Sequence, residues 1–129
     1  MDHAEQVRRF ASAGARFIQL REKLLSPAEF CTQAKAAVET ARDYGVTLII
    51  NDRVDIAIAV GAAGVHLGQD DLPPAAARRL LGASSIIGFS THTLYQVELA
   101  LKLPIDYLAF GPIFPTGTKE KPDRVTGLD

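Results

Sequence analysis

The chain has 129 residues, of which 47% are hydrophobic and 22% are charged, values typical of one globular domain with a core of its own. Its 14 basic and 15 acidic residues give a net charge of −1, which offers no electrostatic reason to expect nucleic acid or a membrane surface as a partner. The single cysteine, Cys31, excludes an intramolecular disulfide, and the lack of a secretory signal or a bilayer-spanning apolar stretch predicts a cytoplasmic location.

Apolar residues at helical spacing, bounded by capping and stop residues, predict five helices. The second helix has the clearest start, because Ser26 and Glu29 form a capping box and Pro27 suits the first helical position. A second capping box, Thr93 with Gln96, begins the last helix. The predicted helices cover residues 3–13, residues 26–45, a short segment that stops at Gly61, residues 73–81 and a segment that begins at Thr93.

Three of these helices have an apolar side that we expect to face a core. Cys31 lies on the apolar side of the second helix, so we predict a buried free thiol there rather than a nucleophile. The residues expected to face inward are Val7, Phe10 and Ala11 in the first helix, Phe30, Ala34, Val38 and Ala41 in the second, and Leu94, Val97 and Leu101 in the last.

Runs rich in Ile, Leu, Val and Phe alternate with the helices and are predicted strands at residues 16–22, 47–52, 64–69, 86–90 and 107–113. Strict alternation predicts parallel strands joined by right-handed crossovers, and continuous apolar runs fit burial on both faces. Five strands suit an open doubly wound sheet, whereas a closed (β/α)8 barrel needs eight strands and about 250 residues. The pattern alone leaves both folds open, and the second would make the chain part of a larger barrel.

Each predicted strand ends in polar groups, and parallel α/β proteins place their chemistry at the carboxyl ends of strands. After the first strand, alternation puts Gln19, Arg21 and Lys23 on one side. The planar fork of an arginine and the point charge of a lysine together suit a diphosphate. A solvated strand end that pairs with nearby carboxylates would give the same pattern.

Asp52 and Asp71, which follow the second and third strands, are candidate metal ligands. Neighbouring parallel strands would bring the two carboxylates to the same end of the sheet, within reach of one ion. One or two carboxylates with a substrate phosphate is the usual way in which a protein holds Mg²⁺. Both residues also stand immediately before predicted helices, so helix capping is the competing explanation.

Two histidines and one loop complete the candidates. His66 lies in the middle of a predicted strand and is expected to be a hydrogen-bonded core histidine, whereas His92 lies in a strand-to-helix turn where it could join a site. No third group suggests a Ser-His-Asp arrangement, so we do not propose a hydrolase. Residues 111–119 carry two threonines, glycines and a lysine that can surround a phosphate, although they lack the order of a Walker A loop.

Five sequence blocks, each weak alone, together resemble thiamine-phosphate synthase in the family's order and over nearly the whole chain. They are residues 19–23 (QLREK), 50–55 (INDRVD), 64–71 (GVHLGQDD), 90–93 (STHT) and 111–119 (GPIFPTGTK). The resemblance implies a (β/α)8 TIM barrel. Residues 1–129 would then form a single incomplete barrel domain that supplies strands two to six of eight.

The resemblance also implies a transferase of thiamine biosynthesis, which joins hydroxymethylpyrimidine diphosphate to hydroxyethylthiazole phosphate and releases diphosphate. Asp52 and Asp71 would hold the cofactor Mg²⁺. The residues implied to contact the pyrimidine diphosphate are Gln19, Leu20, Arg21, Glu22, Lys23, Asn51, Ser90 and Lys119, and those implied to contact the thiazole phosphate are Thr116, Gly117 and Thr118. The implied catalytic residues are Arg21, Lys23, Ser90 and Lys119.

Two alternatives compete with this function. The first is a catalytically inactive barrel remnant that associates with another chain, because an unclosed barrel leaves open edges available for self-association. The second is a thiazole tautomerase paralogue, which resembles the same barrel. A tautomerase has no diphosphate leaving group to hold, so residues 19–23 and the pair Asp52 and Asp71 favour the synthase.

Overall fold

The computed structural model describes residues 1–112, in which helices and strands alternate along the chain. The helices are α1 (His3–Ser12), α2 (Pro27–Asp43), α3 (Val54–Val60), α4 (Pro74–Leu81) and α5 (Leu94–Ala100). The strands are β1 (Phe17–Leu20), β2 (Thr47–Asn51), β3 (Gly64–Leu67), β4 (Ile86–Thr91) and β5 (Tyr107–Phe110). All the predicted elements are present, although β1 is shorter than predicted and ends at Leu20. No helix in residues 1–112 combines the length and apolarity needed to cross a membrane.

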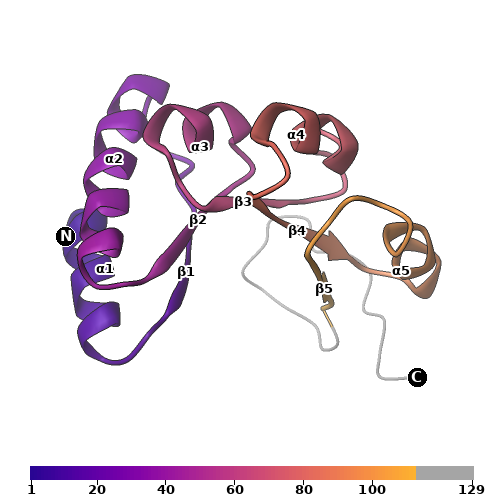
Figure 1. Ribbon diagram of the computed structural model, residues 1–129, viewed down its shortest axis with the longest axis horizontal. Helices are drawn as coiled ribbons and strands as arrows, with labels where there is room; N and C mark the ends of the chain where they lie inside the picture. Colours follow the sequence, from indigo (N-terminus) through magenta and orange to yellow (C-terminus); the bar gives the residue numbers. More distant parts are fainter. Residues whose placement is uncertain (113–129) are drawn as a thin grey trace.

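The strands form one parallel sheet in the order β1-β2-β3-β4-β5, and the helices lie along its outer side (Figure 1). The sheet is strongly curved. Phe17 of β1 and Tyr107 of β5 belong to opposite edges, yet their rings meet edge to face with centroids 6.0 Å apart. The chain therefore forms an open half-barrel, as the partial (β/α)8 prediction requires, and not a doubly wound sheet with helices on both faces.

The hydrophobic core lies between the helices and the outer face of the sheet. Alternate strand residues point into this core, since side chains in a strand alternate between faces. The most deeply buried of them are Leu48, Ile50, Val65, Leu67 and Ile87, each at most 2% exposed. On α2, the four predicted core residues Phe30, Ala34, Val38 and Ala41 are all buried. Burial of each large apolar side chain stabilises the fold by about 1.5–3 kcal/mol.

The predicted capping box of α2 is confirmed, and that of α5 is confirmed in part. The Ser26 hydroxyl accepts a hydrogen bond from the Glu29 N–H at 3.2 Å, and the Glu29 carboxylate accepts one from the Ser26 N–H at 3.3 Å. Thr93 accepts from the Gln96 N–H at 3.1 Å. The Gln96 side chain, however, accepts from the N–H of His92 at 2.7 Å, so the return bond is displaced by one residue.

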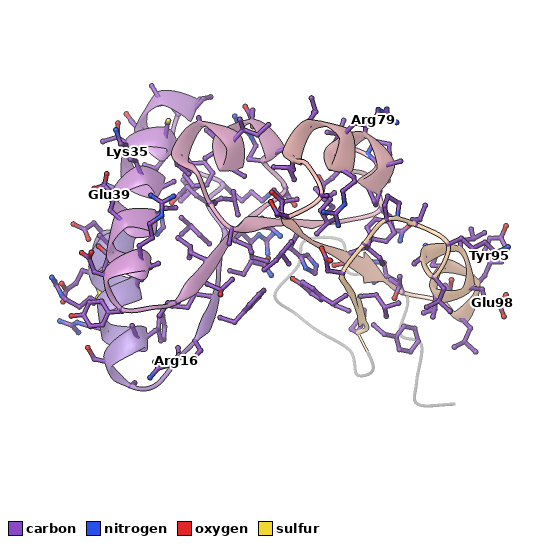
Figure 2. All side chains as sticks on the ribbon, viewed as in Figure 1. Arg16, Lys35, Glu39, Arg79, Tyr95 and Glu98 are labelled. Atoms are coloured by element: carbon purple, nitrogen blue, oxygen red, sulfur yellow. The ribbon has the colours of Figure 1, made fainter. Side chains whose placement is uncertain are left out.

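Three residues predicted to face inward are exposed. Phe10 is 59% exposed because the buried side of α1 is centred on Val7 and Ala11, and at 100° per residue Phe10 lies on its flank. Leu94 and Leu101 are 59% and 72% exposed. The short helix α5 lies against the last strands of the described sheet and buries only Ala100, while Tyr95 and Glu98 point outward (Figure 2). Cys31, predicted to be buried, is half-buried against the core.

Two glycines keep the inner face of the sheet narrow. A Cβ added at Gly64 would lie 1.9 Å from the carbonyl oxygen of Ile86, so β3 and β4 approach each other more closely than any side chain would allow. A Cβ at Gly88 would lie 2.1 Å from the Tyr107 ring. Gly88 therefore lets Tyr107 lie across the inner face, where its hydroxyl can reach β3.

Candidate active site

The carboxyl ends of β1, β2, β3 and β4 line a cavity of about 550 Å³. They meet there because the strands are parallel and paired in register, so that Gln19, Ile49 and Gly64, for example, lie in one row. Six residues predicted from the sequence line the cavity: Gln19, Arg21, Asn51, Asp52, Asp71 and Ser90. The remaining lining residues are His66, Gly68, Gln69, Asp70, His92 and Gln96.

The loop after β1 carries the two predicted cations. Because β1 ends at Leu20, the loop positions Arg21 and Lys23. The sequence-based expectation that strand alternation positions them is wrong. Arg21 lines the cavity and makes no hydrogen bond or ion pair within residues 1–112. Lys23 forms an ion pair with Asp52 from the next strand end. The competing explanation, pairing with a nearby carboxylate, therefore describes Lys23 but not Arg21.

Leu20 and Glu22, also predicted to contact substrate, have other uses in the fold. Leu20 is 6% exposed and belongs to the core on the outer face. The Glu22 carboxylate accepts hydrogen bonds from the N–H groups of Leu24 and Leu25 at 2.8 and 3.2 Å, and it also bonds His3. The Leu24 N–H, followed by His3, lowers the pKa of Glu22. Glu22 thereby fixes the loop that carries Arg21 and Lys23.

Asp52 and Asp71 do not cap the helices that follow them. The N-cap residues of α3 and α4 are Arg53 and Pro73, and neither helix has a side-chain capping bond. Asp52 has a φ of 67°, a left-handed conformation that is uncommon for any residue except glycine and that recurs at functional sites. The capping explanation is therefore wrong, and both carboxylates line the cavity.

The two carboxylates influence each other directly. Asp71 accepts a hydrogen bond from the Gly68 N–H at 2.6 Å. Burial, and then the neighbouring Asp52 carboxylate, raise the pKa of Asp71 because both disfavour its charged form. A divalent cation between the two would remove this repulsion. Residues 1–112 contain no group of three or more His, Cys, Asp or Glu side chains arranged to hold a metal ion.

Polar side chains on the inner face join neighbouring strand ends. The side-chain amides of Gln19 and Asn51 lie 2.7 Å apart. The Gln69 amide donates to the Ser90 carbonyl at 2.8 Å. His66 is 7% exposed and contacts the Ser90 hydroxyl at 2.7 Å. The prediction of a hydrogen-bonded core histidine is thus confirmed, although His66 also lines the cavity.

Burial lowers the pKa of His66 because it disfavours the imidazolium, while the charges of Asp52 and Asp71 act in the opposite direction. The ring is therefore a neutral hydrogen-bonding group at neutral pH. His92 lines the cavity beside Ser90, and its Nδ1 contacts the Gly111 carbonyl. The sequence leaves the role of His92 open, and in the structure His92 is at the cavity wall.

Sequence reasoning did not single out Gln69 or Tyr107 as site residues. Gln69 belongs to a polar strand end that was recognised as a group, so this signal was present. Tyr107 begins β5 and gave no such signal, because its contact with His66 depends on the space that Gly88 leaves on the neighbouring strand. Four predicted substrate contacts lie outside the described residues: Thr116, Gly117, Thr118 and Lys119.

Comparison with known proteins places this geometry in a family context. Residues 1–129 match the family described as Thiamine monophosphate synthase. The chain is 50% identical to the thiamine-phosphate synthase of Chlorobium phaeovibrioides over 109 residues, which are 84% of this chain and 52% of that protein. For the enzyme of the same name from Chlorobium luteolum the identity is 50% over 117 residues, or 91% of this chain and 55% of that protein.

A solved structure supports the same relationship. A thiamine phosphate pyrophosphorylase from Pyrococcus furiosus matches with a TM-score of 0.81 and 37% sequence identity, over 88% of this chain and 55% of that chain. The chain thus spans about half the length of the curated relatives and of the solved structure that it matches. The names of these proteins do not favour an inactive remnant or a thiazole tautomerase.

Proposed function

This chain belongs to the thiamine monophosphate synthase family, and on that premise we propose that it acts as a thiamine-phosphate synthase. Its substrates are hydroxymethylpyrimidine diphosphate and hydroxyethylthiazole phosphate, and its products are thiamine phosphate and diphosphate. One observation carries the proposal: Arg21, Asp52, Asp71 and Ser90, which come from four separate strand ends, line a single cavity.

The proposal assigns the diphosphate of the pyrimidine substrate to this cavity. Arg21 has unused N–H donors at its wall, and Lys23 can turn from Asp52 to a phosphate oxygen because its side chain is 52% exposed. Gln19 and Asn51 provide amide groups on the inner face. These donors suit an anionic group with several oxygens.

The residues present fit a magnesium ion. Asp52 and Asp71 are hard oxygen donors, and burial together with the nearby Asp52 carboxylate raises the pKa of Asp71, so a cation beside Asp71 would stabilise its charged form. We infer that these two side chains hold Mg²⁺ together with substrate phosphate oxygens. The ion, when bound, supplies positive charge that offsets the negative charge of the departing diphosphate.

The reaction needs no protein nucleophile. The bond between the pyrimidine methylene carbon and the diphosphate oxygen breaks, and the diphosphate leaves with the electron pair. The thiazole nitrogen then donates its lone pair to the pyrimidinylmethyl cation and forms the new C–N bond. Arg21 and Lys23 stabilise the charge that develops on the leaving group, which is electrostatic catalysis.

The remaining assignments extend the proposal beyond the cavity. Lys119 would add a third cation to the diphosphate, and Thr116, Gly117 and Thr118 would contact the thiazole phosphate. We also propose a cytoplasmic location, with small molecules rather than nucleic acid or membranes as binding partners. Self-association would occur through β1 and β5, each of which pairs with one strand only in the described sheet. Size-exclusion chromatography tests this last point.

Incubation of the 129-residue chain with both substrates and Mg²⁺ tests the reaction, with thiamine phosphate detected by chromatography. We expect product with the unmodified chain and none after Asp71→Asn or metal chelation. Asp43→Asn, an exposed change of the same type at the end of α2, should leave turnover intact. A folded chain that yields no product would overturn the proposed activity, and turnover that survives Asp71→Asn would overturn the metal assignment.

A further inference from the structure

Three side chains from successive strands form a hydrogen-bonded series on the inner face. The Tyr107 hydroxyl of β5 lies 2.8 Å from Nδ1 of His66 in β3. Nε2 of the same imidazole lies 2.7 Å from the Ser90 hydroxyl of β4. His66 and Ser90 line the cavity, whereas Tyr107 does not. The reaction scheme above gives neither His66 nor Tyr107 a role.

The direction of this series decides what Ser90 can offer a ligand. A neutral imidazole has one N–H donor and one acceptor nitrogen. If Nε2 carries the proton, it donates to the Ser90 oxygen, and the serine O–H is free to donate into the cavity. If Nδ1 carries the proton, the serine O–H is taken up by Nε2, and Ser90 presents only lone pairs to the cavity. An anionic ligand requires the first arrangement.

We propose that His66 and Tyr107 are positioning residues that hold the Ser90 hydroxyl as a donor toward the diphosphate of the substrate. The Tyr107 O–H donates to Nδ1 and so fixes the proton on Nε2, and Nε2–H donates to Ser90. The inference rests on the proposed function, because it assumes that the cavity takes a diphosphate.

Tyr107 is well placed to set this direction. Within residues 1–112, its hydroxyl makes its hydrogen bond to His66 alone. Burial raises the pKa of the phenol, so the O–H remains a donor at neutral pH. Its ring is fixed across Gly88 and meets the edge of Phe17, which leaves the hydroxyl little freedom to turn elsewhere.

Titration calorimetry with inorganic diphosphate and Mg²⁺ tests the series on the 129-residue chain. Removing a hydrogen bond to a charged ligand typically weakens binding by about tenfold or more. We expect about a tenfold loss for His66→Asn, whose shorter amide cannot reach Ser90. His66→Gln places an amide N–H near the former Nε2 position and should bind within about threefold of the original affinity. Tyr107→Phe should lose about threefold to tenfold, since it removes the hydroxyl but keeps the ring.

A double-variant comparison distinguishes positioning from general support of the fold. If His66 acts through Ser90, then Ser90→Ala and the double variant His66→Asn with Ser90→Ala should bind diphosphate equally weakly. Multiplying losses in the double variant would overturn the inference, and so would equal losses for His66→Gln and His66→Asn. Urea unfolding of each variant identifies any that bind weakly because they are unfolded, and such a variant is replaced by Tyr107→Phe as the deciding measurement.

The controls also separate this inference from the function beneath it. If the unmodified chain fails to bind diphosphate with Mg²⁺, the proposed diphosphate site itself is wrong. If the unmodified chain binds and both His66→Asn and Tyr107→Phe bind equally well, the site stands and the positioning role is wrong.

Discussion

An arginine lies at each end of the sheet, and the two arginines differ in how far their side chains are hydrogen-bonded within the fold. At the amino end, the guanidinium of Arg78 in α4 is hydrogen-bonded to groups within the fold. It donates to the carbonyls of Ser85 at 2.6 Å and Pro104 at 3.0 Å, and it pairs with Asp106 at 2.9 Å. At the carboxyl end, Arg21 makes no such bond in residues 1–112 and lies at the wall of the cavity.

The difference shows which end stabilises the fold and which end binds a ligand. A guanidinium whose donors are satisfied by neighbouring loops holds those loops together. Asp106 strengthens this arrangement because it also accepts from the Ile87 N–H at 2.8 Å. A guanidinium with unused donors contributes little to the fold and retains them for an anion. The same division between a stabilising face and a reactive face is general in (β/α)8 proteins.

The largest effect on stability should come from removing the hydrogen bonds of Arg78 at the amino end of the sheet. Arg78→Met keeps the aliphatic stem but leaves the partly buried carbonyl of Ser85, the carbonyl of Pro104 and Asp106 without their donor. We expect the free energy of unfolding to fall by about 3 kcal/mol. Arg79→Met, the neighbouring exposed arginine on α4 (Figure 2), should change it by no more than about 0.5 kcal/mol. Urea unfolding followed by circular dichroism measures both, and equal effects would contradict a structural role for Arg78.

The reciprocal change at the carboxyl end should affect binding and spare stability. Arg21→Met should lower the affinity for inorganic diphosphate with Mg²⁺ by about tenfold, since a charge-assisted donor is lost. Its free energy of unfolding should stay within about 0.5 kcal/mol of the original. Lys35→Met, an exposed cation on α2, serves as the control for the change in net charge. A stability loss as large as that of Arg78→Met would remove the contrast between the ends.

Sequence reasoning succeeded where the deciding interactions are local or follow from parallel register. The Ser26 capping box and the buried side of α2 depend on residues close in sequence, and the convergence of Asp52 and Asp71 follows from adjacent parallel strands. It failed where loops or contacts across strands decide. The sequence predicts no role for Arg78, because only the fold brings residues 82–85 and 104–106 around its guanidinium.

The same limit explains why sequence reasoning did not single out Tyr107. Its contact with His66 crosses β4 at Gly88, and the sequence does not show that this glycine leaves room for the ring of a side chain in the next strand. Glu22 is expected to contact substrate only because the family resemblance includes residues 19–23. In the structure its carboxylate accepts hydrogen bonds from two backbone N–H groups of its own loop, and the sequence alone does not predict this loop geometry.

A smaller and pH-dependent effect should follow from removing the carboxylate of the amino end. The Ile87 N–H and then Arg78 lower the pKa of Asp106, so the ionised form stabilises the fold above the ordinary value of 3.8 and this contribution is lost as the pH falls below it. Because the side chain is 47% exposed, solvent screens the pair, and Asp106→Asn should cost only about 0.5 kcal/mol at pH 7. The urea midpoints of the variant and the original chain should differ at pH 7 and lie closer together at pH 3. A difference that is the same at both pH values would contradict the assignment.

The smallest change should have the opposite sign at the carboxyl end. Burial and the Asp52 carboxylate raise the pKa of Asp71, so its charge is a cost that is absent below pH 3.8 and grows as the pH rises through the raised value. Asp71→Asn keeps an oxygen for the Gly68 N–H and removes this cost, so without metal the variant should be more stable by up to about 0.5 kcal/mol at pH 7. Added Mg²⁺ should raise the urea midpoint of the original chain and leave that of the variant unchanged. A variant that is less stable without metal would mean that Asp71 serves the fold, as Asp106 does, and that the two ends of the sheet do not differ in kind.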